Sequence, residues 1–145
     1  MAHVLVEHDF TSPRPKVFAH LAEHENLEEE LGAQITRVCD GTDGTRNGVG
    51  STRRMKAGPG LTFNETTVEV IPDELIRYRI SSRSPLRGHE GVMLFTDTPG
   101  GGTHLRWEIG FGSYVPGLAA IGARGLRRTI PAGLAAVDTE IAAHA

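Results

Sequence analysis

The sequence predicts an α+β fold in which a curved, seven-stranded antiparallel sheet wraps around one long C-terminal helix. Two observations lead to this prediction. Residues 34–111 form short segments of alternating, β-prone composition that are separated by turn residues. Residues 116–144 instead repeat apolar side chains at the spacing of one helix face, and such a face needs a large apolar surface to cover it.

The length and composition indicate a single domain that covers residues 1–145. The chain is 39% hydrophobic and 23% charged, which excludes disorder, and it lacks the run of about 20 apolar residues that spans a membrane. The first residues lack the apolar core of a secretion signal, and the lone Cys39 allows no internal disulfide, so we expect a cytoplasmic protein. The net charge of −3 gives no general attraction to nucleic acid.

The first predicted elements are a strand and a helix. Residues 3–10 alternate in polarity and are expected to form the first strand. Thr11 or Ser12 is then expected to cap a helix that Pro13 or Pro15 opens, because proline is tolerated in the first turn of a helix. The chain should therefore pass from sheet to helix within these few residues.

Two short helices and six further strands complete the predicted sheet. A break near Glu25 divides the helical region in two, and Gly32 ends it, because glycine commonly terminates helices. Turn residues separate the strands, and the turn between the third and fourth strands is expected at residues 57–60. The six strands are predicted at residues 34–39, 49–56, 61–71, 75–82, 89–98 and 103–112.

Alternation in the last three strands predicts which side chains face the helix. In the seventh strand Leu105 and Phe111 share one face and Arg106 lies on the other. One face of the sheet should therefore be buried and the other exposed to solvent. The sixth strand is ambiguous, because Val92 and Leu94 are as apolar as their neighbours, and we place them outward. The residues expected to face the helix are Ile76, Tyr78, Ile80, His89, Gly91, Met93, Phe95, Leu105, Trp107, Ile109 and Phe111.

The last helix combines an apolar stripe with residues that are unusual in a helix. Gly122, Gly125 and Gly133 lie on or beside the stripe, and Pro131 stands in the middle. Small residues and a bend would leave room for a ligand. The alternatives are close packing of the helix on the sheet, or two consecutive helices of which Pro131 opens the second. The stripe consists of Leu118, Ile121, Leu126, Ile130, Leu134, Val137 and Ile141.

Three groups of residues resemble a known family. They are Gly48-Val-Gly-Ser-Thr-Arg-Arg54; Phe63-Asn-Glu-Thr-Thr67 with Pro72 and Tyr78; and His89-Glu-Gly91 with Gly101-Gly-Thr-His-Leu-Arg-Trp107. With the order of strand, two helices, six strands and long helix, they resemble the polyketide cyclase/dehydrase-like branch of the START-like (SRPBCC) superfamily, which has the helix-grip fold.

The resemblance covers nearly the whole chain. It implies a deep cavity between the sheet and the last helix that takes a hydrophobic or aromatic small molecule. The sequence departs from the family pattern at Thr67, where a large aliphatic residue is common, and at Pro131. Both departures bear on the shape of the cavity.

The hairpin of the third and fourth strands carries an inward charge pair. If it turns around residue 59, Met55 lies opposite Phe63, and the same register places Arg53 opposite Glu65. Met55 and Phe63 are apolar and should face the helix, so the period of two turns the charged pair inward as well. Charged side chains on the inner face must be paired with an opposite charge or hydrated. The pair is either a polar anchor for a ligand or a structural ion pair at the mouth of the cavity.

Further candidate residues lie on the inner faces of the later strands. Tyr78, His89 and Trp107 either line the same space or belong to the core. If the protein is an enzyme, His89 is the best general acid or base, because the pKa of a free histidine is about 6.5. Tyr78 would then donate a hydrogen bond to a carbonyl. The residues predicted to bind the ligand are Arg53, Met55, Phe63, Glu65, Tyr78, His89, Met93, Trp107 and Phe111.

One motif resembles a metal site. His20-Leu-Ala-Glu-His24 places two histidines one helical turn apart, as in some zinc peptidases. Zinc chemistry also needs a third protein ligand and an enclosing site, and the sequence marks neither. We therefore expect two exposed histidines, no metal site and no cofactor.

The sequence leaves three functions open. The first is binding of a hydrophobic or aromatic small molecule in the cavity. The second is a polyketide aromatase, cyclase or dehydratase that uses the same cavity. The third is a protein-interaction or dimerisation module, such as a homodimer, since the outward pair Val92 and Leu94 can mark an interface. We expect neither nucleic acid nor a membrane span among the partners.

Overall fold

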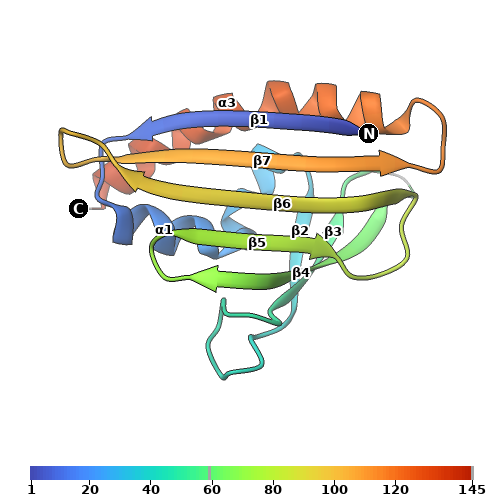
Figure 1. The fold of residues 1–145 in the computed structure, drawn as a ribbon, viewed down its shortest axis with the longest axis horizontal. Helices are drawn as coiled ribbons and strands as arrows, with labels where there is room; N and C mark the ends of the chain where they lie inside the picture. The colour runs from blue at the N-terminus through green and yellow to red at the C-terminus, as the bar shows by residue number, and fades with distance from the viewer. Residues whose placement is uncertain (59, 145) are drawn as a thin grey trace.

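The computed structural model describes residues 1–58 and 60–144, and it confirms the predicted fold class (Figure 1). The strands are β1 (Ala2–Phe10), β2 (Gln34–Cys39), β3 (Thr52–Lys56), β4 (Thr62–Ile71), β5 (Leu75–Ile80), β6 (Leu86–Asp97) and β7 (Thr103–Ser113). The helices are α1 (Arg14–Ala22), the 3₁₀ helix η1 (His24–Leu27), α2 (Glu28–Leu31) and α3 (Leu118–Ala143). In the described ranges, no helix has both the length and the apolar composition that a membrane crossing requires.

The seven strands form one antiparallel sheet in the order β1-β7-β6-β5-β4-β3-β2. Strands β2 to β7 each pair with their neighbours in the sequence, which is the simplest way to build an antiparallel sheet. β1 is the exception, because it pairs with β7 along its whole length, from Ala2 opposite Phe111 to Phe10 opposite Thr103. α3 then runs back along β1 and over β7 (Figure 1).

The predicted register of the β3–β4 hairpin is confirmed. Met55 pairs with Phe63, and Arg53 pairs with Glu65. Residue 59, on which the predicted turn was centred, lies outside the described residues. All four paired side chains are buried, so the inward orientation that their alternation predicted is confirmed as well.

Two strand boundaries differ from the prediction by three residues, and the others agree to within two. β3 begins at Thr52 rather than at residue 49, because Gly50 has a φ of 93°, a left-handed conformation that a strand cannot continue through. β6 begins at Leu86, three residues earlier than predicted, and its pairing with β7 shifts register between Arg87 and Glu90. This irregularity is a β-bulge. A bulge interrupts the alternation of inner and outer side chains, so the start of β6 could not be recognised from a strict period of two.

The predicted cap of α1 is wrong. Pro13 occupies the N-cap position, and no side chain caps the helix. Thr11 instead donates from its backbone N and from its Oγ1 to Asp138 Oδ1 of α3, both at 3.2 Å. The hydroxyl of Thr103 donates to the carbonyl of Ser12 at 2.8 Å. The turn between β1 and α1 is therefore fixed by contacts with α3 and β7 rather than by a local cap.

α3 is one helix from Leu118 to Ala143 with Pro131 inside it, so the alternative of two consecutive helices is wrong. Its buried face differs from the predicted stripe at one position. Ile121 is 71% exposed, whereas Ala123 is 1% exposed. At about 100° per residue these two side chains point to nearly opposite sides of the helix. The prediction that Ile121 belongs to the buried stripe is therefore wrong, and Ala123 faces the sheet instead.

Replacing Pro131 with Ala should stabilise the protein. Proline has no N–H to donate to the carbonyl of Arg127, and Pro131 is exposed, so alanine restores a backbone bond without leaving a hole. Proline inside a helix costs about 3 kcal/mol. Alanine makes the unfolded chain more flexible, which costs about 1 kcal/mol, so the net gain in stability should be about 2 kcal/mol. Urea unfolding measures the gain in stability. The control is Pro99→Ala in the β6–β7 turn, where no helical hydrogen bond is restored and only the greater flexibility of the unfolded chain changes the stability. A Pro131→Ala variant that unfolds more readily than the parent would contradict this account.

Candidate functional site

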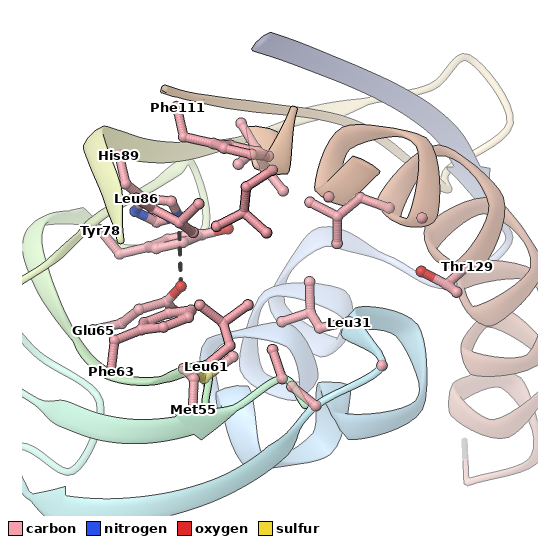
Figure 2. A pocket seen from close by; sticks show the side chains of 18 residues that line it. Leu31, Met55, Leu61, Phe63, Glu65, Tyr78, Leu86, His89, Phe111 and Thr129 are labelled. Carbon is pink, nitrogen blue, oxygen red and sulfur yellow. Dashed lines mark ion pairs between the residues drawn. The ribbon is translucent and has the colours of Figure 1, made fainter. Parts of the chain in front are cut away.

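A cavity of about 320 Å³ lies between the sheet, α2 and α3 (Figure 2). Its sheet side is formed by the inner faces of β3, β4, β5, β6 and β7. Met55 and Phe63 line it from the β3–β4 hairpin, and Phe111 lines it from β7. Leu31 of α2 and Leu126 of α3 close it on the helix side. The walls are therefore mostly apolar, as is usual for small-molecule sites.

The two glycines of α3 that line the cavity have different roles. A Cβ at Gly122 would lie 3.4 Å from Cε2 of Phe111, an ordinary contact distance, so the helix passes close to the aromatic ring at this position. A Cβ at Gly125 would meet no atom within 4 Å, so this glycine borders open space. The helix is therefore close to the sheet at Gly122 and borders open space at Gly125, and the interpretation that the small residues leave room for a ligand stays a prediction.

The cavity opens to solvent beside α3. Four of its lining residues are exposed, which marks the edge of the opening. Gly32 follows α2, Ala57 follows β3, and Gly125 and Thr129 lie on α3. The mouth is therefore bounded by the α2–β2 turn, the β3–β4 hairpin and the first half of the long helix.

One end of the cavity is polar. Glu65, Tyr78 and His89 line it from β4, β5 and β6, and Figure 2 shows Glu65 and His89 facing each other. Oε2 of Glu65 lies 3.6 Å from Nε2 of His89. Behind them, Arg53 donates from Nε and Nη2 to Oε1 of Glu65, at 3.3 and 3.2 Å. The guanidinium fixes one carboxylate oxygen and leaves the other oriented towards the cavity end.

Thr67 completes the fixation of Arg53. Nη1 of Arg53 donates to Oγ1 of Thr67 at 3.0 Å, and the threonine is 2% exposed. A large aliphatic residue at this position would leave that buried donor without a partner. The departure from the family pattern at Thr67 is thus coupled to the presence of the Arg53–Glu65 pair.

Tyr78 lies at the centre of the polar end. Nε1 of Trp107 donates to the Tyr78 hydroxyl at 3.0 Å, and the Arg53 guanidinium lies 5.1 Å from the centroid of the Tyr78 ring. The ring crosses Gly91, where a Cβ would lie 2.1 Å from Cζ of Tyr78. Among the described residues nothing accepts the hydroxyl's own proton, so Tyr78 can still donate one hydrogen bond.

Six of the nine predicted ligand-binding residues line the cavity and three lie behind its wall. The six are Met55, Phe63, Glu65, Tyr78, His89 and Phe111. Arg53 is buried behind Glu65, while Met93 and Trp107 pair with each other across β6 and β7 and are fully buried. In this part of the sheet Phe18 of α1 packs on Phe95, so α1 covers the strands where the cavity would otherwise extend.

Residues 1–142 match the model of the family described as polyketide cyclase/dehydrase and lipid transport. The chain belongs to this family. No curated protein matches the sequence.

Solved structures with the same fold include the protein TTHA0849 from Thermus thermophilus, which is 17% identical with a TM-score of 0.76 and 99% of both chains covered. The ZhuI aromatase/cyclase from Streptomyces sp. R1128 is 16% identical with a TM-score of 0.66, over 97% of this chain and 90% of that one. The Aha1 dimer from Colwellia psychrerythraea is 13% identical with a TM-score of 0.66, over 97% and 96% of the chains. At these identities the likeness concerns the fold.

In this family member His89 lines the cavity beside the β-bulge of β6. It stands two residues before the inward Gly91, so the ordinary alternation of the strand places its side chain on the inner face. Burial lowers the pKa of His89 below its ordinary value; the nearby Glu65 charge opposes this and Arg53 reinforces it. The imidazole is therefore neutral at pH 7. Its Nδ1 is buried and has no hydrogen-bond partner among the described residues.

His24 lies beside the site but is not among the predicted site residues. The prediction that both histidines of the motif are exposed is wrong, because His24 is 3% exposed and its ring packs edge-on against Tyr78, with centroids 5.1 Å apart. Burial, then Arg53 and Arg37, hold its pKa well below the ordinary value, so it is neutral. Its spacing of three residues from the buried Leu21 and Leu27 was the available signal.

His20 of the same motif is half-buried and does not join His24 in a ligand set. Over the residues that the structure describes, no three metal-ligating side chains come together.

Proposed function

We propose that this protein binds a hydrophobic or aromatic small molecule in the cavity between the sheet and α3. The observation that carries the proposal is a cavity with apolar walls and a single polar end, where Glu65, Tyr78 and His89 meet. Its volume of about 320 Å³ equals that of about ten water molecules at about 30 Å³ each. A molecule of one or two rings with a short chain fits this size.

The polar end defines what the ligand presents to it. The free oxygen of Glu65 accepts a hydrogen bond, and the hydroxyl of Tyr78 donates one. A phenolic or alcoholic hydroxyl meets both, because it donates to the carboxylate and accepts from the tyrosine. An apolar body with one hydroxyl at its inner end is therefore the chemistry that this cavity favours.

Catalysis by His89, as in an aromatase or cyclase, has less support from the geometry. A general acid or base must reach the proton that it transfers. Nε2 of His89 faces Glu65, and Nδ1 is buried away from any polar partner among the described residues. The ZhuI aromatase/cyclase has the same fold at 16% identity, which leaves this second function as a proposal of its own.

Filling the cavity should abolish binding. Gly125→Leu places a large side chain in the open space beside Gly125, and leucine also favours the helix over glycine by about 0.8 kcal/mol. The probe is 2-naphthol, a two-ring molecule with one hydroxyl, followed by its own fluorescence. We expect the parent to bind it and the variant to bind it at least about tenfold more weakly, the equivalent of about 1.4 kcal/mol.

The matched control is Ala135→Leu, which adds the same side chain to the exposed face of the same helix. It should bind 2-naphthol like the parent. Equal affinity in the parent and in Gly125→Leu would place binding outside the cavity. A parent protein that binds no member of a panel of naphthols and alkylphenols would also overturn the proposal.

A further inference from the structure

Two loops lie side by side at one end of the sheet. They are the β5–β6 loop, residues 81–85, and the β7–α3 loop, residues 114–117, at the right-hand end of the molecule in Figure 1. The backbone N of Tyr114 donates to the carbonyl of Pro85 at 2.9 Å, which joins the two loops. What they expose therefore forms one surface. We call this surface, residues 81–88 and 114–117, the loop end.

The loop end carries positive charge. Arg83 and Arg87 are exposed and line an open groove between the loops together with Tyr114. Among the described residues no Asp or Glu lines this groove, and neither arginine has a carboxylate within ion-pair distance. The exposed Lys56 lies opposite Thr62, another residue of the groove, and adds a third cation. Since the whole chain has a net charge of −3, this positive charge is a local feature.

The same end exposes apolar side chains. Tyr114 is 72% exposed and Val115 is 50% exposed, in consecutive positions of the β7–α3 loop. Met1 is 77% exposed, and its Sδ lies 3.6 Å from where a Cβ of Gly112 would stand, at the end of β7. The guanidinium of Arg87 lies 5.8 Å from the centroid of the Tyr114 ring. Cations and apolar side chains are therefore neighbours on this surface.

Cations beside exposed aromatic and aliphatic side chains suit an anionic bilayer. Basic side chains are attracted to its acidic headgroups, and aromatic rings favour the level of the headgroups. A stable complex with a folded protein usually takes about 20–30 residues from each partner, more than the two loops supply. We propose that the loop end docks this protein on an anionic lipid bilayer. Arg83 and Arg87 contact the phosphates, and Tyr114 and Val115 enter the interface.

Docking brings the cavity close to the bilayer. Leu118, which lines the cavity, is the first residue of α3 after the loop end. Gly125, at the mouth, lies further along the helix by about 10 Å, at about 1.5 Å for each residue. An apolar ligand dissolved in the bilayer then has a short path into the cavity. The docking itself needs no ligand, so it goes beyond the proposed function and is tested apart from it.

Co-sedimentation with vesicles tests the docking. The full chain should sediment with vesicles of phosphatidylcholine and phosphatidylglycerol, and not with vesicles of phosphatidylcholine alone. High salt should weaken the binding, because it screens exposed charges. Arg83→Gln and Arg87→Gln should each weaken it about fivefold, the equivalent of about 1 kcal/mol for one cation near an anionic surface. The matched control is Arg46→Gln in the β2–β3 loop, which removes the same charge from another exposed site and should bind like the parent.

A second pair of variants tests the insertion of the loop. Val115→Ser should weaken the binding about fivefold, because apolar area no longer leaves water. Val38→Ser on β2 is the matched control, since this valine is also 50% exposed, and it should leave the binding unchanged. Tyr114→Trp places a fluorophore at the loop end. Brominated phosphatidylglycerol should quench it, while Trp107, which is buried in the core, stays unquenched.

Failure to sediment with the anionic vesicles refutes the docking. A loss in Arg46→Gln or Val38→Ser as large as in the loop-end variants refutes the assigned surface. If Val115→Ser binds like the parent and polyglutamate displaces the vesicles, the surface recognises an acidic polymer and the bilayer is refuted. None of the substituted residues lines the cavity, so 2-naphthol binding should be unchanged in every variant. A parent that binds the vesicles but no naphthol refutes the proposed function and leaves the docking intact.

Discussion

Replacing Arg53 with Met is expected to lower the free energy of unfolding by about 3–5 kcal/mol, because it leaves the carboxylate of Glu65 buried without its partner. Both residues are 4% exposed, so water cannot take over the role of the guanidinium. Arg53 also contacts Thr67 and the Tyr78 ring, and both contacts are lost with it. Urea unfolding measures the loss at pH 7.

A second variant isolates the charge. Arg53→Met combined with Glu65→Leu removes both charges and should recover much of the stability, although it also removes the carboxylate that we propose as the acceptor for a ligand hydroxyl. The matched control is Arg77→Met, which breaks half-exposed pairs with Glu69 and Glu90, each worth about 0–1 kcal/mol. If Arg53→Met loses no more than Arg77→Met, the buried pair does not hold this part of the fold together.

Gly91→Ala is expected to cost about 3 kcal/mol or more, or to prevent folding, because its Cβ would lie 2.1 Å from Cζ and 2.4 Å from the hydroxyl oxygen of Tyr78. The ring cannot move aside. It is 2% exposed, and Trp107, His24 and Arg53 each hold it in contact. Thermal or urea unfolding measures the effect, and 2-naphthol binding should disappear with it.

The control for this substitution is Gly100→Ala in the β6–β7 turn, where the added Cβ meets nothing within 4 Å, and it should change stability little. A second variant keeps the test informative if Gly91→Ala does not fold. Gly91→Ala with Tyr78→Leu removes the obstructing ring, so it should fold more stably than Gly91→Ala alone. A Gly91→Ala protein as stable as the parent would show that the polar end is loosely packed.

Most of the sheet could be predicted because its signals are local. The period of two in β7 separated the inner and outer faces, and the hairpin turn fixed the register that brings Arg53 opposite Glu65. That Arg53 and Glu65 contact each other followed from electrostatics alone, since a charge on an inner face requires a partner. These inferences needed no knowledge of how the sheet curves.

The limits of the cavity could not be predicted, because alternation distinguishes inner from outer faces but not cavity from core. Met93 and Phe111 both face inward, yet only Phe111 lines the cavity. The difference depends on which part of the sheet α1 and α3 cover, a tertiary property. The burial of His24 depends likewise on a tertiary contact, the packing of η1 against Tyr78 of β5.

The pairing of β1 with β7 has a consequence for how the chain folds. The first strand emerges first during synthesis, but Ala2 pairs with Phe111, and α3 covers this pair from still further along the chain. β1 must therefore wait, with its backbone groups unpaired, until nearly the whole sequence exists. Closing so long a loop has a large entropic cost before any contact offsets it, which places the joining of β1 to β7 among the late and slow steps of folding.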